Sequence, residues 1–151
     1  MSLDVATRVR ERLAGLGGVI DAGGGASAAH LDALAGVLEE VTPQDARRRA
    51  EFEVWLELMM LARTSPDLRR LALAAHRDIR SICFSVVMVI VGDRRSMAAG
   101  YRDPVVRRQT DALHGLLDGL CLHLALYPGE TSAARVRAVV REHLTTLVPS
   151  A

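Results

Sequence analysis

Apolar residues recur along this chain at the three- and four-residue spacing of amphipathic α-helices, with no credible hairpin and no internal repeat. The spacing predicts six helices, over Leu3–Leu16, Ala28–Val41, 42–64, 65–91, Asp103–Tyr127 and Thr131–Val148. Residues 83–91 (CFSVVMVIV) are rich in the β-branched residues typical of strands, but the helical stripe runs unbroken through them. We therefore predict an all-α fold, a helical bundle of about six helices.

Helix start signals support this assignment. A side chain able to cap a helix precedes four of the six predicted starts, and Pro follows three of these caps. The capping residues are Ser27, Thr42, Ser65 and Asp103. Agreement between the caps and the apolar spacing favours helices over the alternatives.

Two segments interrupt the helical pattern. Residues 17–27 are rich in glycine, but they lack the GxxxxGK[ST] motif of phosphate-binding loops, and the chain contains no Lys. We therefore interpret this segment as a linker. Gly92–Arg102 is predicted to be a second loop, because it carries no apolar stripe.

The predicted helix Asp103–Tyr127 is apolar on two sides. One stripe consists of Leu113, Leu117, Leu120 and Leu124. The other consists of Gly115, Gly119, Leu122 and Leu126. A helix that must bury two faces is either central in its domain or shared between its own core and a partner chain. The sequence pattern leaves open which face would do which.

The composition of the chain narrows the classes of function that it could have. The chain has 151 residues, half of them apolar, which predicts a single all-α domain over residues 1–151 with a sizeable core. The formal net charge of +1 gives no electrostatic footprint for nucleic acid. No secretory signal is visible, and the longest apolar run is too short to span a bilayer. Cys83 and Cys121 lie in apolar stretches and read as buried thiols, so we expect a cytoplasmic protein without membrane contact.

The apolar stretch VWLELMMLA (54–62) predicts a buried half-helix that contains one carboxylate, Glu57. A buried ionised carboxylate is costly, so either an Arg pairs with Glu57 or Glu57 faces a polar ligand. Trp55, Met59 and Met60 read either as core or as the lining of an adaptable apolar pocket.

The histidines are the remaining residues that could line a binding site or take part in catalysis. His76 and Cys83 share a helix face with Arg80 between them, and they could line a pocket or could be ordinary core residues. His114 and Asp118 are four residues apart, as in a base with its orienting carboxylate or in a simple helix pair. No metal-binding motif and no catalytic constellation is present. We therefore expect no metal, no cofactor and no enzymatic activity.

Two stretches carry a family resemblance. Leu113–Leu126 (LHGLLDGLCLHLAL), followed by a short turn and TSAARVRAVVREHL, resembles the last two helices of TetR-family transcriptional regulators. Phe52–Leu71 (FEVWLELMMLARTSPDLRRL) resembles the middle of the regulatory domain in that family. The family's three-helix DNA-binding domain, with its helix-turn-helix, has no counterpart in this sequence. An engineered fragment, a misassigned start and a relative that lost DNA binding are three explanations, and we expect the first.

The resemblance implies a small-molecule effector domain that forms a homodimer and meets DNA only through the missing domain. It implies a linker-type helix at 3–16, effector-binding helices over 28–102 and dimerisation helices over 103–148, the last two long helices forming a dimeric four-helix bundle. It implies a small, mostly apolar effector contacted by Trp55, Glu57, Met59, Met60, His76, Arg80 and Cys83. It implies a dimer interface of Leu113, Gly115, Leu116, Gly119, Leu120, Leu122, Leu126, Val136, Val140 and Leu144.

Two other functions remain possible at this point. The first is a stand-alone all-α binding or scaffold protein that uses the same helices without DNA-binding activity. The second is a small helical enzyme that uses Glu57, His76 or the His114–Asp118 pair, which would require strongly shifted pKa values within one cleft.

Overall fold

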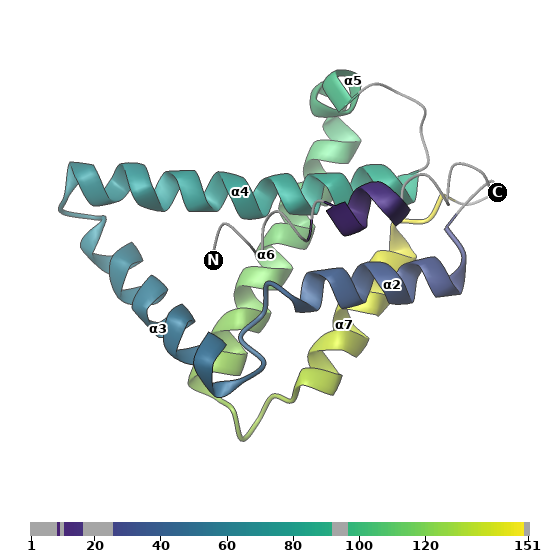
Figure 1. The fold of residues 1–151 in the computed structure, drawn as a ribbon. Helices are drawn as coiled ribbons and strands as arrows, with labels where there is room; N and C mark the ends of the chain where they lie inside the picture. The colour runs from purple at the N-terminus through teal and green to yellow at the C-terminus, as the bar shows by residue number, and fades with distance from the viewer. Residues whose placement is uncertain (1–8, 10, 17–25, 92–96, 150–151) are drawn as a thin grey trace.

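The computed structural model describes residue 9 and residues 11–16, 26–91 and 97–149. Every regular element in these residues is a helix, which confirms the all-α prediction (Figure 1). The helices are α2 (Ala28–Glu39), α3 (Ala46–Leu61), α4 (Pro66–Val91), α5 (Met97–Arg102), α6 (Pro104–Leu126) and α7 (Ala133–Thr146). Residues 11–16 form a further helical segment, whereas the first part of the predicted helix Leu3–Leu16 and residues 17–25 of the predicted linker lie outside the described residues.

The predicted caps hold at most helix starts. The Ser27 hydroxyl accepts a hydrogen bond from the His30 N–H at 3.3 Å, and His30 Nδ1 accepts one from the Ser27 N–H at 3.1 Å. Asp103 caps α6 by accepting from the Val105 N–H at 2.7 Å. These side chains satisfy N–H groups that the first helical turn leaves without a partner.

The start of α3 was predicted three residues too early. Thr42 does not cap α3; its hydroxyl donates to the Glu39 carbonyl at 2.8 Å and closes the end of α2. The cap of α3 is Asp45, which accepts from the Arg48 N–H at 2.8 Å. Two capping side chains stand close together in this sequence, and the pattern of Thr followed by Pro favoured the wrong one.

The structure also tests the predictions for the C-terminal part of α4 and for the segment that follows it. The β-branched tail of α4 is helical up to Val91, as the unbroken apolar stripe predicts. The predicted loop Gly92–Arg102 is wrong for its second half, because Met97–Arg102 forms α5. Contact with α4 holds this short helix, since the Tyr101 ring stacks on Phe84 with the two centroids 3.9 Å apart.

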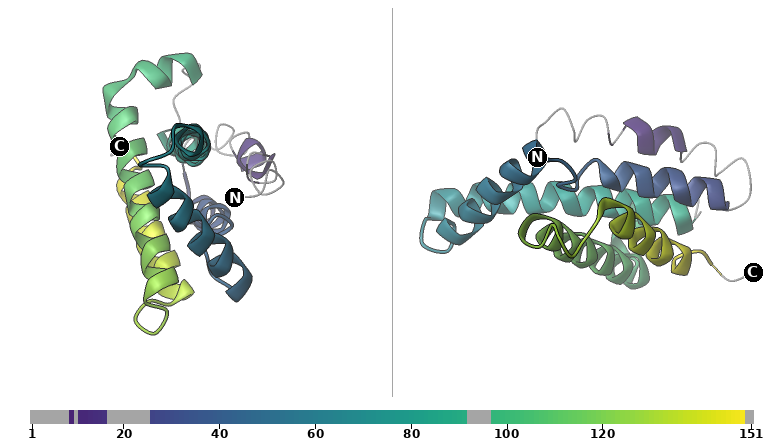
Figure 2. Two further views of the ribbon diagram at one scale, coloured as in Figure 1. Left: turned by 90° about the vertical axis from the view of Figure 1, so that its left-hand side faces the viewer. Right: turned by 90° about the horizontal axis from the view of Figure 1, so that it is seen from below.

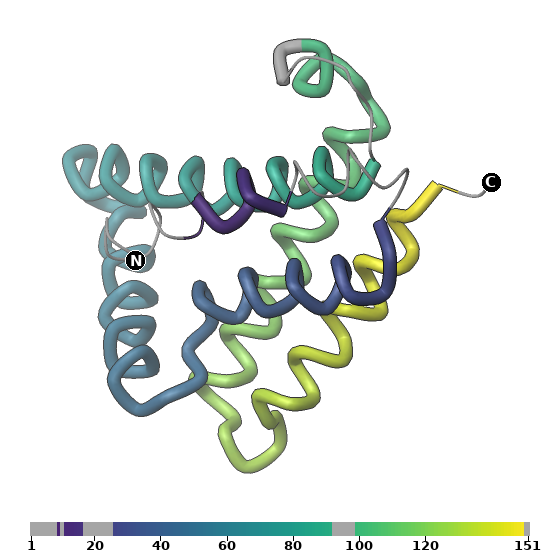
Figure 3. Tube along the Cα trace, turned by 45° about the vertical axis from the view of Figure 1, so that its right-hand side comes forward, coloured from purple at the N-terminus to yellow at the C-terminus, as the bar shows by residue number. Residues whose placement is uncertain are grey.

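The helices are arranged in layers. α6 and α7 lie side by side along one side of the molecule, and α2 and α4 cover their inner surface (Figure 2). α3 begins near the C-terminal end of α6 and runs to the N-terminal end of α4, so that α3, α4 and α6 form three sides of a triangle (Figures 1 and 3). Among the described residues, the other long helices therefore cover one face of the α6–α7 layer.

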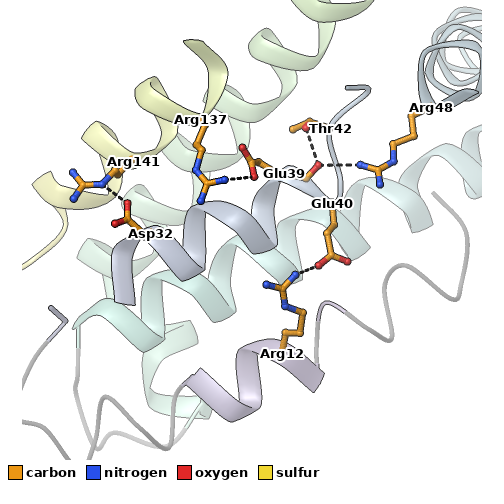
Figure 4. A network of polar contacts seen from close by, with 8 residues as sticks. All are labelled: Arg12, Asp32, Glu39, Glu40, Thr42, Arg48, Arg137 and Arg141. Atoms are coloured by element: carbon orange, nitrogen blue, oxygen red, sulfur yellow. Dashed lines mark hydrogen bonds and ion pairs between the residues drawn. The ribbon is translucent and has the colours of Figure 1, made fainter. Parts of the chain in front are cut away.

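The core fills the space between α2, α4, α6 and α7. Its largest fully buried side chains include Leu34, Phe84, Leu113, Leu117 and Leu144. α2 and α7 are also joined at the rim of their contact by ion pairs, one between Arg137 and Glu39 at 2.9 Å and one between Arg141 and Asp32 (Figure 4). This contact combines apolar burial with charge pairing along its edge.

α3 is packed differently from the other long helices. The apolar stretch in its second half predicts a buried half-helix, but none of the residues of α3 is fully buried. Val54, Met60 and Leu61 each leave more than half of their surface exposed. The prediction was wrong because the apolar residues of α3 are spread around the helix, whereas α4 and α6 cover only one side of it.

Candidate functional site

The outer face of α6 is a regular surface that the described helices leave uncovered. Positions 108, 112, 115, 119, 122 and 126 follow one another at alternating spacings of four and three residues, the heptad spacing of helices that pack along their length. Arg108 starts this row, and Ala112, Gly115, Gly119, Leu122 and Leu126 continue it. We call these six residues the α6 outer row. Apart from Arg108 at one end, it is made of small and apolar residues.

The glycines of the α6 outer row are not required by the chain's own packing. A methyl group added at Gly115 or Gly119 would meet no atom within 4 Å. Leu122 and Leu126 on the same row are 36% and 50% exposed. The opposite stripe, by contrast, packs on the chain's own core, where Leu113 and Leu117 are buried. The two apolar stripes of α6 therefore have different roles. The stripe that contains Leu113 and Leu117 packs in the core, and the stripe that contains Gly115 and Gly119 faces outward.

α7, which packs beside α6, also has exposed residues. Its exposed side carries Ala134, Ala138 and Thr145, which are small, together with Arg135 and Glu142. α6 and α7 lie side by side (Figure 2).

Four residues predicted at a dimer interface belong instead to the chain's own core. Leu113, Val136, Val140 and Leu144 are at most 2% exposed, so they offer no surface to a partner. Helical spacing identified them as apolar but could not say which apolar stripe faces inward. Leu116 and Leu120 are half-buried, and Leu120 packs against the core.

The predicted effector contacts on α3 have different environments. Trp55 is half-buried, whereas Glu57, Met59 and Met60 are exposed. Glu57 was singled out because a buried carboxylate would need a counter-charge, but water solvates it here. Neither an Arg partner nor a polar ligand is needed to explain this residue.

The predicted contacts on α4 divide between the core and a polar cluster. Cys83 is fully buried in the core and does not line an open surface, and burial raises the pKa of its thiol to about 12. Arg80 binds Asp111 of α6, with Nη2 and Oδ1 2.8 Å apart. Asp111 is a site residue that the helical pattern did not indicate, although it lies one turn before His114 on α6.

A pair of histidines lies beside this ion pair. The rings of His76 on α4 and His114 on α6 are 4.7 Å apart at their centroids, and His114 Nε2 lies 3.7 Å from an Asp118 carboxylate oxygen. His114 is only 5% exposed. Burial lowers the pKa of His114 below its ordinary value of 6.5, an effect that the charge of Asp118 opposes. Arg80, Asp111, His76, His114 and Asp118 thus form a polar cluster where α4 crosses α6.

The described residues form neither a metal site nor a membrane-spanning helix. Within residues 26–91 and 97–149, no group of three or more His, Cys, Asp or Glu residues is placed to hold a metal ion. None of the helices in the same part of the chain has the length and apolar character that crossing a membrane requires.

Comparison with known proteins identifies the family. Residues 30–149 match the family described as BetI-type transcriptional repressor, C-terminal. No curated protein and no solved structure gives a significant match. The matched region runs from the third residue of α2 to beyond the end of α7, and it includes the α6 outer row and the polar cluster. Such a domain is the effector-binding and dimerisation part of a TetR-type regulator. The chain therefore belongs to the family of BetI-type repressor C-terminal domains, within the TetR-family regulators.

Proposed function

We propose that this chain is the sensing half of a transcriptional regulator, in which two copies associate through α6 and α7. The observation that carries the proposal is the α6 outer row, whose glycines face open space while the opposite leucine stripe is buried. Small residues at heptad spacing let two helices approach closely along their length. A two-fold axis would bring the same surface of two chains together as a four-helix bundle. Contact with DNA would come from a separate domain.

The effector site that we propose lies between α3, α4 and α6. α3 offers half-buried Trp55 and the adaptable side chains of Met59 and Met60, which suit a small and mostly apolar molecule. The polar cluster at the crossing of α4 and α6 adds hydrogen-bonding groups, with His76 exposed among them. An apolar body with one polar group is the effector that these side chains favour.

Light scattering on the purified chain tests the dimer. At micromolar concentration we expect a mass near twice the 16.3 kDa of one chain, with an interface of about 1,500 Å² in total. Replacing Gly119→Leu places a large side chain on the α6 outer row and should shift the equilibrium toward monomer. Ala29→Leu, which adds similar bulk at an exposed position of α2, is the control and should leave the dimer intact. A monodisperse monomer for the unmodified chain would overturn the proposal.

A gentler variant separates dimerisation from folding. In the double variant Gly115→Ala and Gly119→Ala, the two added methyl groups would meet no atom of the same chain within 4 Å. It should therefore stabilise the helix of an isolated chain by about 1 kcal/mol per site, because Ala favours helix over Gly. If two chains meet there, the same methyl groups should weaken dimerisation. Stronger folding without any weakening of the dimer would place the interface elsewhere.

The single Trp of the chain provides a test of the effector site. Titration with the fluorescent probe 8-anilinonaphthalene-1-sulfonate should quench Trp55 in a saturable way, with one probe bound per chain. Met59→Asp should weaken this binding, whereas Leu71→Asp, at another exposed apolar position on α4, should not. Equal weakening by both variants, or quenching without saturation, would argue against a defined site.

A further inference from the structure

The side of α7 that faces away from the core carries two opposite charges, two turns apart. Val140 and Leu144 are buried in the core, so their side of the helix faces inward. Arg135, Ala138 and Glu142 lie on the opposite side at spacings of three and four residues, and all three are exposed. This stripe therefore presents a base, a small residue and an acid to its surroundings.

The ion pairs of α7 leave these two charges unused. Arg137 and Arg141 face α2, where each pairs with a carboxylate of that helix. Among the residues that the structure describes, neither Arg135 nor Glu142 forms an ion pair. Seven residues of helix separate them by about 10 Å along the axis, so they are not placed to pair with each other.

The helix itself does not favour these charges at these positions. Arg135 is the third residue of α7, where the unpaired N–H groups of a helix start carry partial positive charge. A basic residue in the first turn is slightly unfavourable, and so is an acid such as Glu142 toward the C-terminal end. The folding of a single chain therefore does not explain either charge, which points to a role between chains.

A two-fold axis would pair the two charges with each other. When two copies of one chain meet about such an axis, residue i contacts residue j of the partner, and j contacts i. If the axis passes beside Ala138 and the two α7 helices run in opposite directions, Arg135 comes level with Glu142 of the partner subunit. The same symmetry places Glu142 level with Arg135 of the partner subunit. The small side chain of Ala138 at the centre lets the two helices approach closely.

We propose that Arg135 and Glu142 form two ion pairs across the dimer axis and so select a second copy of this chain as the partner. A related chain with another charge pattern on this stripe would meet like charges, which oppose association. This inference rests on the proposed function, because it requires that α7 lie in the contact between two chains. It goes further by naming the residues that decide which chain is accepted.

Reversing one charge at a time tests the pairing. Arg135→Glu sets carboxylates against carboxylates at both ends of the contact, and Glu142→Arg sets arginines against arginines. We expect either variant to raise the dissociation constant of the dimer about tenfold or more at low salt, measured by analytical ultracentrifugation. Both reversals introduce charges that the helix dipole favours, so each single chain should still fold. Arg63→Glu makes the same charge change at an exposed position after α3 and should leave the dissociation constant unaltered.

Two combinations should restore the dimer. The double variant Arg135→Glu with Glu142→Arg again sets opposite charges against each other, so it should dimerise like the unmodified chain. An equal mixture of the two single variants should form mainly heterodimers, well above the share of about half that random pairing gives. Native mass spectrometry distinguishes the heterodimer from the two homodimers, because the variants differ in mass.

The outcomes separate this inference from the proposed function. A monomeric unmodified chain would overturn both. If the unmodified chain is a dimer and both single reversals leave its dissociation constant unchanged, the ion pairs are wrong and the dimer stands. Random pairing in the mixture, or a double variant that stays as weak as the single ones, would contradict the ion pairs in the same way.

Discussion

α2 and α3 follow one another along the chain, yet they are used in opposite ways. In α2 the buried residues gather on one side of a short helix and pack against α7. In α3 no residue is fully buried, although its second half is apolar almost throughout. The number of apolar residues therefore does not decide burial in this fold. Their placement around the helix, and the presence of a matching stripe on another helix, decide it.

The ion pairs between α2 and α7 add to the contrast between α2 and α3. The carboxylates of α2 meet arginines of α7 at the edge of an apolar contact, so charge and burial act on the same pair of helices (Figure 4). The Glu39 carbonyl also accepts hydrogen bonds from Thr42 at 2.8 Å and from Arg48 at 3.4 Å, where the chain leaves α2 for α3. α3 is thus anchored at its N-terminal end, while most of its apolar surface remains available.

Truncating a core side chain should give the largest effect. Leu144→Ala removes a fully buried side chain of α7 and should lower the free energy of unfolding by about 3 kcal/mol. Met60→Ala on α3 removes a side chain that is 63% exposed and should change it by less than about 0.5 kcal/mol. Urea denaturation at one fixed protein concentration measures both values. Similar losses for the two variants would show that α3 is covered in solution, for instance by another chain.

A smaller effect should follow from acidification. The pKa of His114 is lowered in the folded chain by burial, so the unfolded chain binds the proton more readily. Stability is therefore greatest above pH 6.5 and should fall as the pH drops through 6.5 toward the lowered pKa. His114→Gln should reduce this loss between pH 7.5 and 5.5, a range above the ordinary pKa values of carboxylates. His143, whose pKa burial also lowers, should account for part of what remains. An unchanged pH dependence in His114→Gln would contradict this assignment.

The ion pairs between α2 and α7 should give the smallest effect. Arg137 and Glu39 are partly exposed, and pairs of this kind contribute less than about 1 kcal/mol. Arg137→Ala should therefore destabilise the chain slightly at low salt, and the difference should shrink at 1 M sodium chloride. Arg63→Ala, at an exposed position after α3, is the control. A loss as large as that of Leu144→Ala would mean that the pair supports the core contact directly.

Much of the fold can be predicted because the relevant information is local. The caps Ser27 and Asp103 act within a few residues, and the helical stripe through residues 83–91 outweighs their β-branched composition. The choice between Thr42 and Asp45 as the cap of α3 could not be made from sequence, because both are good capping residues and the end of α2 uses Thr42.

The site was less predictable because it depends on relations between helices. Helical spacing found both apolar stripes of α6, but only packing shows that the one containing Gly115 and Gly119 faces outward. The meeting of His76 with His114 joins residues of two helices whose crossing no local pattern specifies. Glu57 was predicted to be buried because its neighbours in the sequence are apolar, but its side chain is exposed in the structure.

The pairing of α2 with α7 also bears on how the chain reaches this fold. The residues that join them are 98 positions apart for Glu39 and Arg137, and 109 apart for Asp32 and Arg141. Contacts between such distant residues slow folding, because a long loop must close before they form. During synthesis the apolar stripe of α2 emerges long before its partner, and it stays without that partner until α7 has been made. Completion of α7 is therefore the step that lets the core close.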